Sequence, residues 1–483
     1  MVIDALKYQI LQQFGFVPTE EQGQALDAFA RFLTDRDPDA VMILRGSAGT
    51  GKTSLSGAIV RTLKAIRQKV MLLAPTGRAA KVFSLNSGCP AYTIHRRIYR
   101  EKSFAGVDGQ FNLNDNLFTD TLFMVDEASM ISNLGLGGGN FGSGCLLDDL
   151  VRFVYQGHND RLMLIGDKAQ LPPVGEEESP ALNRMMLEGY GLKVYECDLN
   201  EVLRQSQESG ILYNATVIRQ MITHDDITQL PLIRFKGFAD IVMMPGNELV
   251  ESLANSYYRV GWDETMVITR SNKRANIYNN GIRNMVLDRE EELSCGDMLM
   301  IVMNNYFWTE KERNEAKEAL NAIPPFLANG DRAKVLRVSR HMELYGFRFA
   351  TLLLQFPDYD NYEMSVTALL DTLQSEAPAL THEQQEQLFH GVEEDYQDVP
   401  LKADRMKAIR GDQYFNALQV KYAYAITCHK AQGGQWEHVY VDQGYMTDDM
   451  LTPDYIHWLY TAFTRAKDKL FLVNWPKTQT EQA

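Results

Sequence analysis

The 483-residue sequence is poor in cysteine and has no cysteine in a metal-ligand pattern. Its five cysteines are odd in number and widely spaced, which argues against a disulfide framework or a zinc site and is typical of reduced thiols. The chain does not open with a basic segment and an apolar core, and no stretch approaches the roughly 18 apolar residues of a membrane span. We therefore expect a cytoplasmic protein without a membrane partner.

Two segments lack charges of one sign. Residues 45–100 hold 11 Lys and Arg and no acidic residue, whereas residues 358–398 hold 11 Asp and Glu and no Lys or Arg. Much of the formal net charge of −15 is therefore concentrated in one acidic segment, which is typical of a solvated face. The basic segment is the part of the chain that suits an anionic partner such as nucleic acid.

A complete phosphate-binding loop lies at the start of the basic segment. The apolar run Val41–Leu44 predicts a strand before the loop, and Ser54–Lys64 predicts a helix after it. In such a loop the backbone N–H groups face phosphate oxygens, the lysine reaches the β- and γ-phosphates, and the last hydroxyl binds Mg²⁺. The sequence therefore predicts a nucleotide ligand. The loop consists of Gly46, Ser47, Ala48, Gly49, Thr50, Gly51, Lys52 and Thr53.

Polar residues at two further strand ends suit phosphoryl transfer. Asp126 and Glu127 follow the apolar run Leu122–Val125, and we expect Asp126 to hold Mg²⁺ through water and Glu127 to polarise the attacking water. Gln170 follows another run and can sense the γ-phosphate or orient water. The alternatives are a helix cap for the acidic pair and an ordinary turn for the segment before Gln170. For the acidic pair, the preceding phosphate-binding loop favours the catalytic role.

Two basic segments suit the backbone of a nucleic acid. Both combine hydroxyls with cations after an apolar run, which allows phosphate contacts that do not read base sequence. The alternative is a pair of solvated basic turns. The candidate residues are Pro75, Thr76, Arg78 and Lys81 in the first segment, and Thr93 and His95 in the second.

An arginine near the end of the sequence is a further candidate. The segment Leu459–Lys467 leads into the last apolar run and places Arg465 just beyond a helix turn. An arginine delivered to the nucleotide of another domain increases the rate by about 10³–10⁵. The alternative is an ordinary surface arginine.

Apolar runs alternate with amphipathic stretches, which predicts an α/β fold with parallel sheets. Residues 296–410 instead contain short β-like runs followed by an acidic, Gln-rich stretch, which predicts an inserted β-barrel with a helical addition. Gly135–Gly144 predicts a surface loop, and Arg96–Thr119 a hairpin. The strands form two sets, which predicts two sheets. They are Val41–Leu44, Val70–Ala74, Leu122–Val125 and Leu162–Ile165, then Met266–Thr269, Val439–Val441 and Leu470–Val473.

The order and identity of these segments resemble the superfamily 1B DNA helicases of the RecD-like and phage Dda-like type. The resemblance covers nearly the whole chain, and its motifs are jointly specific. The matching segments, in family order, are Thr19–Gln22 (Q motif), Gly46–Thr53 (I), Ala74–Lys81 (Ia), Val125–Ser129 (II), Gly166–Val174 (III), Leu199–Arg204 (IV), Ala425–Gly434 (V) and Tyr460–Lys467 (VI).

The resemblance implies roles that the residues alone do not give. It implies that Gln22 reads adenine, that Arg204 contacts the γ-phosphate and that Arg465 is an arginine finger. His429 and Lys430 are implied to grip single-stranded DNA. Gln435 stands where the family usually has an acidic residue that contacts ribose, so nucleotide discrimination is expected to be looser.

The same resemblance implies the domain organisation. Residues 1–200 are expected to form a first RecA-like P-loop NTPase domain that carries a strand-separating pin at about 96–119. Residues 201–295 and 411–483 are expected to form the second RecA-like domain. Residues 296–410 are expected to be an SH3-like barrel with the acidic helical addition.

The predicted function is an ATP-dependent, Mg²⁺-dependent DNA helicase that moves 5′→3′ on single-stranded DNA. Its expected partners are single strands and forked or 5′-tailed duplexes, and it is expected to act as a monomer. Two alternatives stay open. One is a superfamily 1 RNA helicase, because only recognition of the 2′-hydroxyl separates RNA from DNA tracks. The other is a nucleotide-switched DNA clamp that does not unwind.

Overall fold

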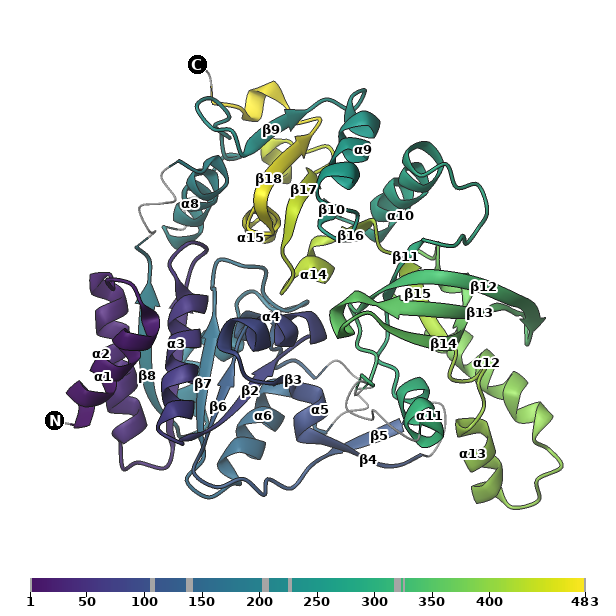
Figure 1. The fold of residues 1–483 in the computed structure, drawn as a ribbon, viewed down its shortest axis with the longest axis horizontal. Coiled ribbons are helices and arrows are strands. Elements are labelled where there is room, and N and C mark those ends of the chain that lie inside the picture. Colours follow the sequence, from purple (N-terminus) through teal and green to yellow (C-terminus); the bar gives the residue numbers. More distant parts are fainter. Residues whose placement is uncertain are drawn as a thin grey trace.

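The computed structural model describes residues 2–104, 109–135, 142–201, 208–224, 228–316, 323–324 and 326–481. Figure 1 shows a first α/β domain in purple to blue, a second α/β domain in teal and yellow, and a barrel in green beside both. Within the described ranges, no helix has the length and apolar character needed to cross a bilayer.

A six-stranded parallel sheet forms the centre of the first domain, with the strand order β3-β2-β6-β7-β1-β8. Its strands are β1 (Ala40–Gly46), β2 (Lys69–Ala74), β3 (Ala91–Thr93), β6 (Thr121–Val125), β7 (Arg161–Gly166) and β8 (Lys193–Leu199). Its helices are α1 (Val2–Phe14), α2 (Glu20–Thr34), α3 (Lys52–Ala65), α4 (Gly77–Ser87), α5 (Ile94–Ile98), α6 (Leu146–Tyr155) and α7 (Arg184–Gly189).

Both faces of this sheet are covered, which explains the continuous apolar runs of its inner strands. Met42 and Leu44 of β1 pack with α1, α2 and α3 on one face. Val41 and Ile43 pack with α5 and α6 on the other face, as the two-residue period of a strand requires. The polar loops at the carboxyl ends of the strands are therefore held on a rigid sheet.

The second domain is built on a five-stranded parallel sheet with the order β16-β10-β17-β18-β9. Its strands are β9 (Ile241–Met244), β10 (Thr265–Thr269), β16 (Ala425–Thr427), β17 (Trp436–Asp442) and β18 (Ala466–Val473). Its helices are α8 (Gly210–Thr223), α9 (Leu249–Arg259), α10 (Asn272–Gly281), α14 (Cys428–Ala431) and α15 (Pro453–Phe463).

The inserted region forms a closed barrel of five strands. They are β11 (Met298–Ile301), β12 (Arg332–Leu344), β13 (Phe347–Phe356), β14 (Tyr362–Leu369) and β15 (Leu418–Tyr422). The associated helices are α11 (Phe307–Glu315), α12 (His382–Asp395) and α13 (Lys402–Arg410). The barrel closes with β15, a strand that comes after residue 410.

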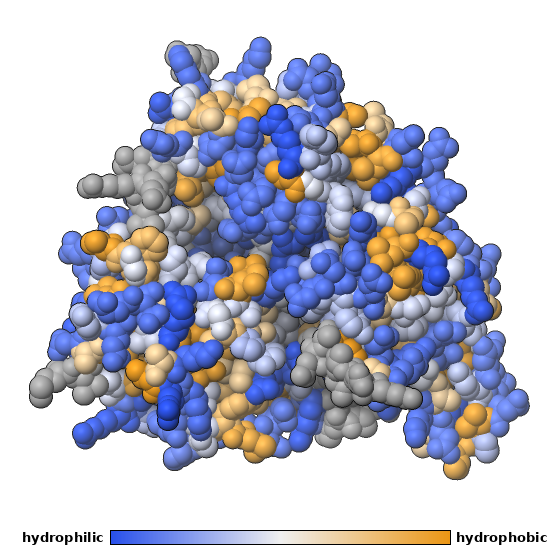
Figure 2. Space-filling model, viewed as in Figure 1, coloured by the Kyte–Doolittle hydropathy of each residue, from blue (hydrophilic) through white to orange (hydrophobic). Residues whose placement is uncertain are grey.

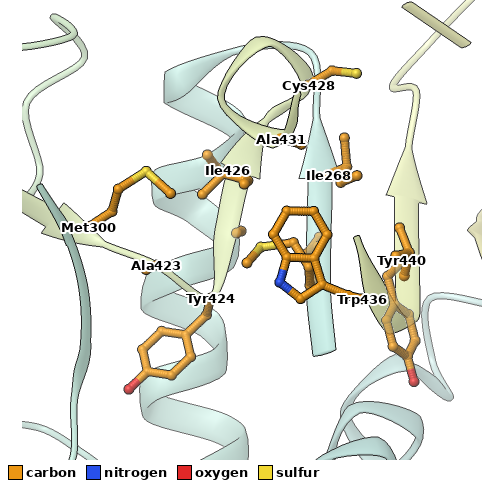
Figure 3. Close-up of a cluster of buried hydrophobic side chains, with 14 of the residues drawn as sticks. Ile268, Met300, Ala423, Tyr424, Ile426, Cys428, Ala431, Trp436 and Tyr440 are labelled. Carbon is orange, nitrogen blue, oxygen red and sulfur yellow. The ribbon is translucent and has the colours of Figure 1, made fainter. Parts of the chain in front are cut away.

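A shared core joins the barrel to the second domain. In Figure 3, Met300 of the barrel lies on one side of Ala423 and Tyr424, and Trp436 and Tyr440 of β17 lie on the other. The Tyr424 hydroxyl accepts a hydrogen bond from the backbone N–H of Met298 at 3.0 Å, at the start of barrel strand β11. The barrel is therefore anchored to the second sheet rather than hung on a free linker.

A two-stranded hairpin leaves the first domain beside α5. Its strands β4 (Tyr99–Phe104) and β5 (Gly109–Leu113) pair antiparallel, and in Figure 1 they extend on the side where α11 lies. The outer surface in the same view is mostly hydrophilic, with small separate apolar patches (Figure 2).

The expected fold class of two RecA-like domains with parallel sheets and an inserted barrel is confirmed. All seven expected strands of the two sheets are present. Six strands were not predicted from the sequence, because they are short or carry polar residues: β3, β8, β9, β14, β15 and β16. Of the expected Gly135–Gly144 loop, residues 136–141 lie outside the described part of the chain.

Candidate nucleotide cleft and nucleic-acid channel

The phosphate-binding loop joins the end of β1 to the start of α3. Gly49 and Gly51 have φ angles of +78° and +77°, which are strained for other residues, so this turn requires glycine at both positions. The Lys52 ammonium donates to the carbonyl of Gly46 at 2.9 Å, across the loop. Thr53 is exposed at the first turn of α3, where its hydroxyl can reach a bound cation.

Asp126 and Glu127 lie directly after β6, one of the two central strands of the sheet. Burial, together with the neighbouring Glu127 carboxylate, raises the pKa of Asp126 to about 6, although the Lys52 ammonium opposes the shift. Glu127 has a φ of +53°, an uncommon conformation for a residue other than glycine. Two crowded carboxylates beside one lysine form a site that a divalent cation would neutralise.

Three buried polar atoms lie in this region without hydrogen-bond partners among the described residues. Among the described residues, Glu127 Oε2, Gln170 Oε1 and Ser129 Oγ are buried and have no hydrogen-bond partner. Buried polar atoms are normally satisfied, so the two acceptors and the hydroxyl suit a bound water that donates to them. In the described ranges no cluster of three His, Cys, Asp or Glu is placed to hold a metal ion.

Gln22 connects helix α2 to the phosphate-binding loop. Its side-chain oxygen accepts from the N–H of Thr19 at 3.0 Å, in a capping box, and its amide nitrogen donates to the carbonyl of Thr50 at 2.9 Å. Both ends of this buried amide are therefore engaged inside the first domain, where they fix the loop against the helix.

Helix α15 of the second domain lies against this cleft. The Tyr460 hydroxyl accepts from the N–H of Ala48 at 3.0 Å and donates to Asp167 at 2.7 Å. The Thr461 hydroxyl accepts from the N–H of Leu171 at 2.8 Å, and His457 Nδ1 lies 2.9 Å from the carbonyl of Ala169. One helix of the second domain thus contacts both the phosphate-binding loop and the loop after β7.

Arg465, the predicted arginine finger, lies inside the second domain. Arg465 is buried and donates to the carbonyls of Thr461 and Gly434, at 3.0 and 3.2 Å, and to the Thr464 hydroxyl. Its guanidinium is thus held inside the second domain. Arg204 lies outside the described residues.

Arg219 of α8, in the described part of the second domain, contacts the phosphate-binding loop. It donates to the Ser47 hydroxyl at 2.6 Å and to the carbonyl of Asn200 at 3.3 Å. Together with His457 it lines a cavity of about 460 Å³ between the two domains. Sequence analysis missed Arg219, because it lies within an ordinary amphipathic helix that has no local signal.

A second cavity, of about 360 Å³, brings most of the nucleic-acid candidates together. They come from segments far apart in the sequence, at the carboxyl ends of strands in both sheets. The candidates in its lining are Pro75, Thr76, Arg78, Thr93, His95, His429 and Lys430. Residues that were not predicted as nucleic-acid contacts complete the lining, from the barrel side and from both α/β domains: Gly77, Met130, Asn304, Phe326, Ala328, Asn329, Gly330 and Gln432.

Burial lowers the pKa values of titratable side chains that line this second cavity, which we call the channel. Desolvation lowers the pKa of His95 to about 4, so that this imidazole is neutral at pH 7. Desolvation lowers the pKa of Lys430 to about 8, and it also lowers the pKa of His429. Lys430 therefore keeps most of its charge at pH 7. It is a cation whose charge an incoming phosphate would stabilise.

Two predicted site residues lie elsewhere. The Lys81 ammonium contacts the carbonyl of Pro357 at 3.2 Å and Asp358 at 3.4 Å, so it bridges α4 to the barrel. Gln435 is exposed, and its carbonyl accepts from Arg78 at 3.0 Å. Among the contacts of the described residues, none joins Gln435 to the phosphate-binding loop.

Comparisons with known families agree with the order of the two domains. A model of the AAA domain matches residues 19–220, and a model of the UvrD-like helicase C-terminal domain matches residues 422–473. The ATP-dependent RecD2 DNA helicase of Deinococcus radiodurans is 30% identical over 157 residues. An uncharacterized protein of Acanthamoeba polyphaga mimivirus is 21% identical over 495 residues, which cover 89% of this chain and 94% of that protein.

The chain spans only part of some relatives. It covers 18% of the Deinococcus helicase, and that match takes in 32% of this chain. An uncharacterized protein of Methanocaldococcus jannaschii is 34% identical over 171 residues, which are 33% of this chain and 14% of that protein.

Pif1 helicases are among the solved structures that match along most of the chain. Pif1 from Bacteroides in complex with ADP-AlF3 and ssDNA has a TM-score of 0.47 at 14% identity, covering 97% of this chain and 95% of that one. Pif1 from Candida albicans has a TM-score of 0.41 at 16% identity, covering 97% of both chains.

Proposed function

We propose that the chain is a superfamily 1B helicase of the RecD type and works as an ATP-driven motor on single-stranded DNA, a proposal that the AAA and UvrD-like family models and the RecD2 relative support. The observation that carries this proposal is that two helices in contact with each other reach both the channel and the phosphate-binding loop. Helix α14 brings His429 and Lys430 to the channel, and α15 brings Tyr460 to the phosphate-binding loop. The two helices are in contact, since the Cys428 thiol lies 3.6 Å from the carbonyl of Trp458.

Hydrolysis is assigned to residues of the first domain. Lys52 binds the β- and γ-phosphates, and Glu127 orients and polarises the attacking water, for which its buried Oε2 is available. We assign Gln170 to the same water, since its Oε1 is also buried without a partner. Mg²⁺, held by Thr53 and Asp126, would neutralise charge on the phosphates.

The second domain completes the site by closing on the first. We assign Arg219 to this closure, since it already contacts Ser47 of the phosphate-binding loop. For Arg465 to act as a finger, its three hydrogen bonds inside the second domain must break. The implied finger role of Arg465 therefore requires a rearrangement of the last turn of α15 as the cleft closes.

The proposed translocation depends on two sets of strand contacts, one on each domain, that hold the strand alternately. Thr76, Arg78 and Thr93 lie on the first domain, and His429 and Lys430 lie on the second, around one channel. When the cleft closes and opens, these two sets of contacts move relative to each other. Because the contacts are of a kind that holds phosphates, movement is expected to tolerate any base sequence.

The hairpin β4–β5 is assigned the role of a wedge at the duplex junction. It projects from the first domain, and its first strand begins a few residues after Thr93 and His95, which line the channel. Opening a base pair costs on the order of 1.4 kcal/mol of stacking per step, so an edge that blocks reannealing suffices.

The test of the proposed function is steady-state ATPase activity with and without single strands. We expect oligo-dT to raise kcat at least about tenfold, and Lys52→Ala to abolish the activity, because the lysine holds phosphate charge. Activity stimulated only by RNA would make the chain an RNA motor. A chain that binds oligo-dT in an ATP-dependent way without stimulated turnover would be a clamp, and the motor proposal would fail.

A further inference from the structure

Tyr460 connects three parts of the molecule through one hydroxyl group. It lies in the last turns of α15, and its ring is almost fully buried, with 1% of its surface exposed. The hydroxyl accepts the N–H of Ala48 at 3.0 Å and donates to Asp167 Oδ2 at 2.7 Å. A single phenol thus satisfies an amide of the phosphate-binding loop and a buried carboxylate of the loop after β7.

The amide that Tyr460 occupies belongs to a loop whose N–H groups serve to bind phosphate. Hydrogen bonds from an N–H to a charged phosphate oxygen are roughly twice as strong as those to a neutral hydroxyl. The Ala48 N–H therefore forms a stronger hydrogen bond with an incoming phosphate than with the phenol. Burial and the Asp167 carboxylate raise the pKa of Tyr460 well above its usual value, so the group that yields is a neutral phenol.

Replacement of the Tyr460 hydroxyl by phosphate at Ala48 affects Arg465, because both residues depend on the same turn of α15. The Arg465 Nε donates to the carbonyl of Thr461, the residue next to Tyr460, and Arg465 Nη2 donates to Thr464. The turn that holds Arg465 is therefore the turn that Tyr460 fixes to the first domain. Release of the phenol from Ala48 removes one of the contacts that fix this turn to the first domain, while the bond of Thr461 to Leu171 remains.

We propose that Tyr460 is a positioning residue that caps the Ala48 amide in competition with nucleotide phosphate and so couples phosphate arrival to release of Arg465. The proposal rests on the proposed function for the role of Arg465. Its first step, competition at Ala48, depends only on nucleotide binding. The bonds of Thr461 to Leu171 and of His457 to Ala169 keep α15 docked on the first domain while the phenol moves.

The test is the affinity of a fluorescent ATP analogue for Tyr460→Phe without DNA. This variant keeps the buried ring and removes the competing hydroxyl, so we expect the Kd to fall about two- to tenfold, the equivalent of one hydrogen bond. We also expect kcat with oligo-dT to fall while KM falls with it, because the coupling to Arg465 is lost. A merely structural role for Tyr460 would not tighten binding.

The matched control is Tyr455→Phe, one turn earlier in α15. Its hydroxyl donates to Gln443, inside the second domain, so the Kd should not change. An unchanged or raised Kd for a Tyr460→Phe variant that unfolds at the wild-type temperature would overturn the proposal. The affinity measurement needs neither DNA nor turnover, so its failure can be told apart from failure of the motor proposal.

If Tyr460→Phe does not fold, the wild-type chain provides the second measurement. Tyrosines are replaced by 3-fluorotyrosine, and the ¹⁹F resonances are followed as a non-hydrolysable ATP analogue is added. The resonance of Tyr460 is assigned with Tyr460→Trp or, if that fails, from its sensitivity to Asp167→Asn. We expect it to shift on saturation, and a resonance that stays in place would overturn the proposal.

Discussion

Lys430 is the residue of the channel whose contribution should depend on pH. Its free-state pKa of about 8 means that the ammonium loses its proton as the pH rises through 8. A bound phosphate favours the charged form, so binding above pH 8 requires uptake of a proton and becomes weaker. We expect affinity for oligo-dT to fall between pH 8 and 9.5 by up to about tenfold per pH unit, measured by fluorescence anisotropy at constant salt.

The variant Lys430→Arg tests the assignment, because a guanidinium stays charged over this range. Its affinity should show a flatter dependence on pH. Lys81→Arg serves as the matched control, since the Lys81 ammonium contacts Asp358 on the barrel and should not report on the strand. An equal slope in the wild type and in Lys430→Arg would assign the pH dependence to another group.

At the scale of elements, the contact between α4 and the barrel depends on a glycine. A Cβ atom at Gly77 would lie 2.8 Å from Asp331 Oδ1 and 3.2 Å from Ala328 Cβ. Asp331 cannot easily yield, because it is buried and accepts from the Tyr359 hydroxyl and the Ala328 N–H, both at 2.7 Å. Gly77→Ala should therefore separate α4 from the barrel.

We expect Gly77→Ala to cost about 1–3 kcal/mol, as is usual for overpacking, and to lower the midpoint of thermal unfolding. Its affinity for oligo-dT should fall as well, since Gly77 lines the channel. The control is Gly23→Ala in α2, where a Cβ meets no atom within 4 Å and alanine favours the helix. If both variants unfold at the same temperature, α4 and the barrel are not tightly docked.

At the scale of the whole molecule, the resemblance to the RecD-like helicases implies a direction of movement. From the family, we expect unwinding of duplexes that carry a 5′ single-stranded tail and none of duplexes that carry only a 3′ tail. Initial binding should weaken steeply with salt, because phosphate contacts release counterions. Strand separation is measured with labelled duplexes, a blunt duplex being the control. Efficient unwinding from the 3′ tail would refute the assigned polarity.

Much of the nucleotide site was determined locally by the sequence. The turn from β1 into α3 needs glycine at Gly49 and Gly51, and the apolar runs before the loop and before Asp126 are long enough to identify buried parallel strands. Carboxyl ends of the parallel strands of one sheet lie at the same edge, so Lys52 after β1 and Asp126 after β6 could be expected on the same side of the molecule. These features depend on residues close together in the chain.

Only the tertiary structure decided which groups of the second domain meet the first. Arg219 and Tyr460 reach the phosphate-binding loop from helices α8 and α15, whereas Arg465 is held inside its own domain and Lys81 is taken up by the barrel. Contacts between domains depend on the packing of whole sheets and helices. No local pattern encodes that packing, and it therefore determines which of several similar cations faces a ligand.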